Sequence, residues 1–105
     1  MDDRYRVFVA IEPGTEMEEF MDHMCNTEHV LDYAYSYGDQ FGIFKIKDML
    51  LYALYAKDRA EAGMIARCIR VTSKLNLKKG KLYRTSVGGP GTELEDFAKH
   101  FGANP

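Results

Sequence analysis

The sequence predicts one α+β domain over residues 1–105, with a mostly antiparallel sheet of four or five strands and two or three helices packed on one face. Two observations favour this class. Short segments rich in β-branched and aromatic residues alternate with segments of helical periodicity. The phrase PGTE, which is typical of a helix start, occurs at residues 13–16 and again at 90–93. A length of 105 residues suits a single hydrophobic core.

The first strand and the first helix are predicted within residues 5–25. The sequence YRVFVAI over 5–11 is typical of a buried strand, which Glu12-Pro13-Gly14 ends. Thr15 is expected to cap the helix that follows, with Glu18 completing a capping box. The apolar residues of this helix recur at helical spacing on one face: Met17, Phe20, Met21 and Met24.

Three further strands are predicted before the second helix. Residues 30–37 alternate strictly, with one face made of Leu31, Tyr33, Tyr35 and Tyr37. After the turn residues 38–40, the segment 41–47 is a suitable antiparallel partner. Segment 49–57 is compatible with a helix or a strand, and we favour a strand over 50–56. The reason is that residues 58–61, Asp-Arg-Ala-Glu, form a capping box of their own, which starts a helix at Asp58.

The rest of the chain predicts a long helix, a strand and a short helix. The helix spans 58–75, and its expected buried stripe consists of Met64, Ile65, Cys68, Val71 and Leu75. A strand follows over 81–87, then a glycine-rich loop and a helix capped by Thr92. The resulting order, β-α-β-β-(β)-α-β-α, has the ferredoxin-like arrangement as its nearest template, and such an order carries no function by itself.

The two helix-start segments are alike beyond their caps. Residues 13–24 and 90–101 are identical at seven of twelve positions, including His23 and His100. The preceding strands, YRVFVAI and KLYRTSV, are not alike. Convergence on good capping chemistry is therefore favoured over duplication, although capping does not explain the paired histidines.

The amino-acid composition indicates an ordinary globular domain. Hydrophobic residues make up 46% of the chain and charged residues 29%, as in ordinary globular domains. No apolar run approaches the ~20 residues of a membrane span, so no membrane association is expected. An acidic start and two cysteines without a secretory signal favour the cytoplasm.

Charge is divided unevenly along the chain, whose net charge is -2. Residues 1–58 carry 5 Lys or Arg against 12 Asp or Glu, whereas residues 59–105 carry 9 against 4. Such a charge asymmetry can steer a binding partner or favour the pairing of two copies of the chain. Helices whose exposed faces happen to carry opposite charge also produce it.

The loop after the last strand is a candidate site for a small anion or phosphate. Glycines allow close backbone approach, and a helix start offers free N–H groups; the candidate residues are Gly88, Gly89, Gly91 and Thr92. The loop matches no nucleotide-binding signature, and the carboxylates of the first helical turn oppose an anion. A turn with a helix cap is therefore the favoured interpretation.

A basic stripe suggests a second possible site. Its cations, with the tyrosine row, form a candidate surface for nucleic acid or a protein partner: Arg67, Arg70, Lys74, Lys78, Lys79, Lys81, Tyr33, Tyr35 and Tyr37. The pI of 5.9 is low for a nucleic-acid-binding domain. A solvated helix face and a tyrosine row packed against helices or a second subunit are favoured.

No signature of catalysis or metal binding is present. His23, Cys25 and His29 lie close in sequence, but their spacing fits no zinc pattern. We expect no cofactor, no metal and, on balance, no enzymatic activity. The leading hypothesis is a small cytoplasmic binding or accessory module that acts by self-association, as a homodimer whose second copy covers the tyrosine row.

Overall fold

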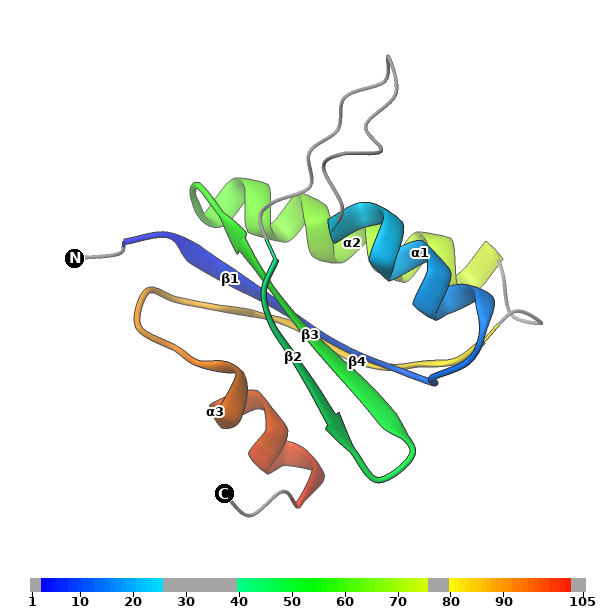
Figure 1. Ribbon diagram of the computed structural model, residues 1–105. Helices are drawn as coiled ribbons and strands as arrows, with labels where there is room; N and C mark the ends of the chain where they lie inside the picture. The colour runs from blue at the N-terminus through cyan, green and yellow to red at the C-terminus, as the bar shows by residue number, and fades with distance from the viewer. Residues whose placement is uncertain (1–2, 26–39, 76–79, 103–105) are drawn as a thin grey trace.

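The computed structural model describes residues 3–25, 40–75 and 80–102. In these residues, four antiparallel strands form one sheet with the order β2-β3-β1-β4. Helices α1 and α2 lie on one face of the sheet, and the short helix α3 lies on the other (Figure 1). The predicted α+β class is therefore confirmed. The elements are β1 (Tyr5–Ile11), α1 (Glu16–Cys25), β2 (Gln40–Ile46), β3 (Met49–Ala56), α2 (Arg59–Leu75), β4 (Leu82–Gly88), α3 (Leu94–Ala98) and the 3₁₀ turn η2 (Lys99–Phe101).

The sheet is centred on β1 and β3. β1 pairs with β3 on one side and with β4 on the other, and β3 also pairs with β2. Every residue of β1 from Arg6 to Ile11 is buried, because helices cover both faces of the strand. This double cover explains why β1 has a continuous apolar run in place of an alternating one.

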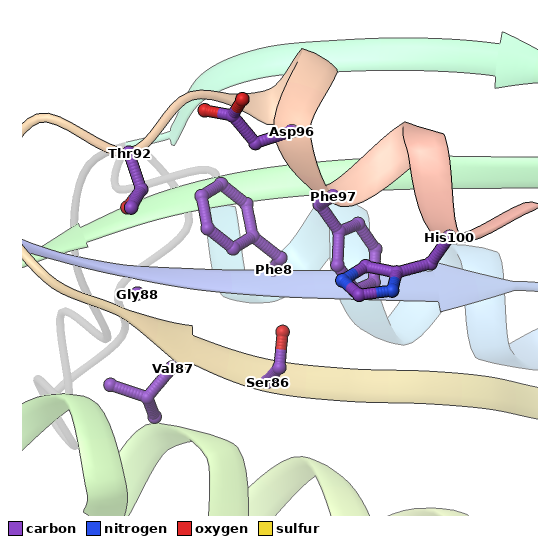
Figure 2. A pocket seen from close by; sticks show the side chains of 8 residues that line it. All are labelled: Phe8, Ser86, Val87, Gly88, Thr92, Asp96, Phe97 and His100. Atoms are coloured by element: carbon purple, nitrogen blue, oxygen red, sulfur yellow. The ribbon is translucent and has the colours of Figure 1, made fainter.

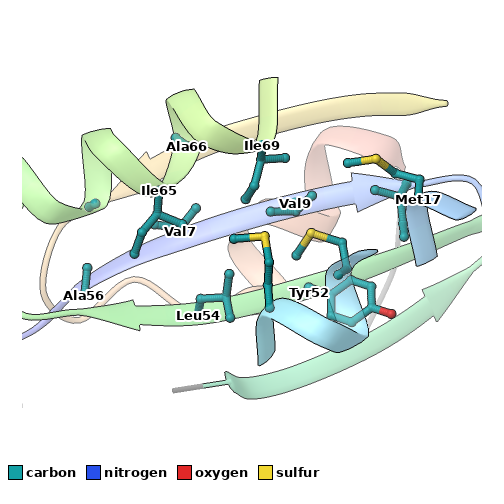
Figure 3. Packing of buried hydrophobic residues seen from close by; sticks show 13 residues of the cluster. Val7, Val9, Met17, Tyr52, Leu54, Ala56, Ile65, Ala66 and Ile69 are labelled. Carbon is teal, nitrogen blue, oxygen red and sulfur yellow. The ribbon is translucent and has the colours of Figure 1, made fainter. Parts of the chain in front are cut away.

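The larger hydrophobic core lies between the sheet and the pair α1 and α2 (Figure 3). Alternate residues of β1 (Val7, Val9 and Ile11) and of β3 (Tyr52, Leu54 and Ala56) point toward the helices, as the two-residue period of a strand requires. The helices contribute Met17, Met21, Met24, Ala62, Ile65, Ala66 and Ile69. The hydroxyl of the fully buried Tyr52 donates to Asp22 Oδ1 at 2.6 Å, which ties β3 to α1.

A second core lies on the opposite face, under α3. Phe8 and Ala10 of β1 and Leu51 and Ala53 of β3 pack there against Leu94, Phe97 and Ala98. Two helices do share a face, as predicted, but α3 crosses to the other side. The alternate residues of β1 and β3 are also apolar, so this second face needs its own cover.

Most predicted elements are confirmed to within one residue. The ambiguous segment 49–57 forms strand β3, and Asp58 starts α2, with its carboxylate accepting from the N–H of Glu61 at 2.8 Å. The predicted strand 30–37, with its Leu31 and tyrosine row, lies outside the described residues. No helix in the described ranges is long and apolar enough to cross a membrane.

The predicted buried stripe of α2 is wrong except at Ile65. The helix buries Ala62, Ile65, Ala66 and Ile69 against the sheet. Met64, Val71 and Leu75 are exposed by 68%, 48% and 80%, and Cys68 is half-buried. α2 carries two apolar stripes, and the stripe with two alanines is buried because small side chains let a helix approach a sheet closely.

Candidate functional site

The repeated sequence phrase forms the same turn in both places. Gly14 and Gly91 have positive φ angles of 74° and 89°, and each follows a proline, which is typical of a type II turn. The hydroxyl of Thr15 donates to the carbonyl of Glu12 at 2.9 Å, and the hydroxyl of Thr92 donates to the carbonyl of Gly89 at 2.7 Å. The repeat therefore specifies a turn that leads from a strand into a helix.

Thr15 directly precedes α1, as predicted, and its carbonyl accepts from the N–H groups of Glu18 and Glu19. Neither threonine caps its helix through its side chain, contrary to the prediction. Each hydroxyl donates backward into its turn, and the residue that caps α3 is Glu93. The N–H of Glu93 donates to Asp96 Oδ2 at 2.9 Å. Near α1, the carboxylate of Glu18 accepts from the N–H of Gly14 at 3.3 Å, one residue earlier than a standard capping box.

Arg6 anchors the second turn to the sheet. Its side chain comes from β1, and the residue is only 3% exposed. The Nε–H donates to the carbonyl of Thr92 at 3.1 Å, and an Nη–H donates to the carbonyl of Arg4. The guanidinium also lies 5.0 Å from the ring centre of Tyr55 and 5.9 Å from that of Phe41. Hydrogen bonds and ring contacts compensate for the burial of this charge.

A pocket of about 180 Å³ lies next to this turn, on the α3 face of the sheet (Figure 2). Its lining comes from β1, β4, the turn, α3 and η2: Phe8, Ser86, Val87, Gly88, Thr92, Asp96, Phe97 and His100. The rings of Phe8 and Phe97 are stacked with centroids 5.4 Å apart, and the ring of His100 meets Phe97 edge-on at 6.2 Å. The pocket therefore has an aromatic wall.

Some polar groups of the pocket already make hydrogen bonds within the protein, and others do not. The hydroxyl of Thr92 and the carboxylate of Asp96 make the turn and cap contacts described above. In the described part of the chain, neither the hydroxyl of Ser86 nor the imidazole of His100 has a hydrogen-bond partner. Figure 2 shows the Ser86 hydroxyl pointing toward the phenyl rings. A few unengaged polar groups around an apolar wall are typical of a small-molecule site.

Comparison with known proteins does not assign this site. No protein-family model, curated protein or solved structure gives a match. Among the described residues, no three His, Cys, Asp or Glu side chains lie close enough together to hold a metal ion. Of the histidine and cysteine cluster noted in the sequence, His29 lies outside the described residues, as do Tyr33, Tyr35, Tyr37, Lys78 and Lys79.

The candidate residues of the glycine-rich loop and of the basic stripe do not form one site. Gly88 and Thr92 line the pocket, and Gly89 and Gly91 shape the turn beside it. Arg67, Arg70 and Lys74 belong to α2, on the opposite face of the sheet. Arg70 donates to the carbonyl of Thr85 at 3.2 Å, and the ammonium of Lys81 lies 5.1 Å from the ring centre of Tyr83.

The side of α2 that faces away from the sheet is a second candidate surface. Met64, Val71 and Leu75 follow one another at helical spacing, and we call them the outer face of α2. Two exposed cations, Arg67 and Lys74, flank this face. Exposed apolar patches bordered by charged residues mark interaction sites on many proteins.

Sequence reasoning missed Arg6 and most of the pocket. Arg6 is the one charged residue in the strand segment YRVFVAI, and a charge in a buried strand needs partners. The sequence therefore contained a signal that could have identified it. His100 was marked only by its equivalence to His23 in the repeat. Phe8, Ser86 and Phe97 become neighbours only when β4 pairs with β1 and α3 folds onto them.

Proposed function

We propose that this protein is a small binding or accessory module that works by self-association through the outer face of α2. The observation that carries the proposal is the exposure of Met64, Val71 and Leu75 on one side of a 17-residue helix. Covering apolar surface of this kind is the main favourable term in protein association. A second copy of the chain is the most common cover, usually through two-fold symmetry.

Charge also favours a second copy. The exposed side of α1 is acidic, with Glu16, Glu19 and Asp22, while one side of α2 presents Arg67 and Lys74. Both helices lie on the same face of the sheet (Figure 1). One copy can therefore set its acidic helix against the basic flank of the other, and such complementarity orients two partners and speeds their association.

The same charges disfavour nucleic acid. The acidic α1 lies in the same layer as the basic side of α2 and repels a phosphate backbone that approaches this face. Arg70 is also bonded to the backbone of β4, which leaves a short stretch of exposed cations on the helix.

Analytical ultracentrifugation over a wide range of protein concentration tests the proposal. The wild-type protein should form dimers that dissociate on dilution. Val71→Glu places a charge at the centre of the outer face and should be a monomer throughout. Glutamate is also the better helix former, so the helix itself is not weakened. Gly63→Glu is the matched control, because it adds the same charge to α2 at an exposed site with no atom within 4 Å of a new Cβ. This control should still dimerise, because it leaves the apolar residues of the outer face intact and affects only the orienting charge of Arg67, one helical turn further along.

Three results would contradict the proposal. The first is a wild-type protein that stays monomeric at all concentrations. The second is dimerisation that Val71→Glu and Gly63→Glu leave equally intact. The third is tight, salt-dependent binding of a single-stranded oligonucleotide that Arg67→Glu abolishes and Val71→Glu does not change, because this pattern would assign the face to nucleic acid.

A further inference from the structure

The pocket beside the second turn has the dimensions of a site for a single ring. Its volume is about 180 Å³, and a cavity of roughly 150 Å³ in another protein is large enough to bind benzene. Phe8 and Phe97 are 4% and 2% exposed, so their rings are held firmly in the second core. Only a small part of each ring is open to the pocket, so a ligand touches this wall over a small area and needs no rearrangement of the sheet.

The charges near the pocket favour a cation over an anion. Asp96 is the acidic residue among those that line the pocket, and Glu93 and Glu95 belong to the same short segment of chain. The ammonium of Lys99 lies 3.9 Å from Asp96 Oδ1, but both side chains are exposed, so this ion pair offsets only part of the negative charge. The guanidinium of Arg6, which would attract an anion, is directed at the carbonyls of Thr92 and Arg4.

We propose that this pocket binds a small organic amine that carries one flat ring. The ring lies against Phe8 and Phe97, and the ammonium group lies at the edge formed by Asp96. Ser86 and His100 supply the remaining hydrogen bonds, because neither side chain makes a hydrogen bond to another of the described residues. The pocket lies on the α3 side of the sheet, whereas α2 covers the other side. Ligand binding is therefore independent of the proposed self-association through the outer face of α2.

Three probes of similar shape and different charge test the proposal: benzylamine, benzyl alcohol and benzoate. Each is titrated into the 105-residue chain, and backbone amide chemical shifts are followed by NMR. Benzylamine should bind most tightly and shift the amides of residues 86–88 and 92–100. Its affinity should exceed that of benzyl alcohol about two- to fivefold, the effect of one partly exposed ion pair. Benzoate should bind most weakly.

Two variants that each remove one negative charge test whether the preference for benzylamine depends on Asp96. Asp96→Asn removes the charge at the edge of the pocket but keeps an oxygen that can accept from the N–H of Glu93. It should abolish the preference for benzylamine over benzyl alcohol. Glu95→Gln removes a charge from the same helical turn at a residue that does not line the pocket, and it should retain that preference.

The ranking of the probes on the wild-type protein decides the outcome even if a variant fails to fold. Tightest binding by benzoate would make the loop an anion site and overturn the proposal. Equal binding of all three probes would show that the pocket does not select an amine, and this too would overturn the proposal. The absence of shifts at residues 86–100 would show that no ligand of this class enters.

Discussion

Gly88 should not tolerate even a methyl group. It ends β4 at the pocket, where a Cβ would lie 2.4 Å from Thr92 Oγ1 and 2.7 Å from Phe8 Cε2. Ordinary contacts between such atoms are about 3.5 Å or longer. Phe8 cannot move away easily, because its ring is stacked on Phe97. We therefore expect Gly88→Ala to lower the free energy of unfolding by about 1–3 kcal/mol, the usual cost of overpacking.

Chemical denaturation and calorimetry measure this loss, which corresponds to roughly 4–8 °C in Tm per kcal/mol for a domain of this size. Gly63→Ala is the control: it lies in the middle of α2, where a Cβ meets nothing within 4 Å. That change should instead stabilise by about 0.5–1 kcal/mol, because alanine is the better helix former. Combining Gly88→Ala with Thr92→Ala should recover part of the loss. A Gly88→Ala protein as stable as wild type would refute the packing described for the pocket.

Two further predictions concern stability. Thr15→Val and Thr92→Val keep the side-chain shape but remove the hydroxyl donor, so each should cost about 0.5–1.5 kcal/mol by urea denaturation; unchanged stability in both would show that the hydroxyls do not hold the turns. Tyr52→Phe should cost about 1–2 kcal/mol by losing its bond to Asp22. Adding Asp22→Asn to Tyr52→Phe should then cost little more, and a full additive loss in the double variant would mean that the two side chains act separately.

Local sequence signals predicted the fold elements well. The run YRVFVAI, the proline-glycine turns and the capping box at Asp58 each depend on residues close together in the chain, so no tertiary information is needed to interpret them. The capping box also resolved segment 49–57 in favour of a strand, since a helix that starts at Asp58 cannot continue from before it.

The misassigned stripe of α2 shows where local signals fail. Periodicity indicates which residues share a helix face, but it does not indicate which of two apolar faces meets the sheet. That choice depends on how closely α2 approaches the strands, and Ala62 and Ala66 allow the closer approach. The same limit applied to α3, whose face of the sheet was not predictable from its own five residues.

The candidate sites were even less accessible from sequence. The pocket joins Phe8 to Ser86 and Phe97 across nearly the whole length of the chain, and it exists only because β1 and β4 are neighbours in the sheet. Sequence reasoning located Gly88 and Thr92 through the glycine-rich loop, but interpreted Thr92 as a helix cap. The backward hydrogen bond of its hydroxyl depends on the turn geometry, in which Gly91 takes a positive φ.

The most direct test of the central claim is isotope-filtered NMR on a mixture of labelled and unlabelled protein, which detects contacts between copies only. Self-association through the outer face of α2 predicts intermolecular cross-peaks from the methyl groups of Met64, Val71 and Leu75, and their loss in Val71→Glu but not in Gly63→Glu. Intermolecular cross-peaks confined to other surfaces, or none at concentrations where the protein is fully folded, would contradict the claim.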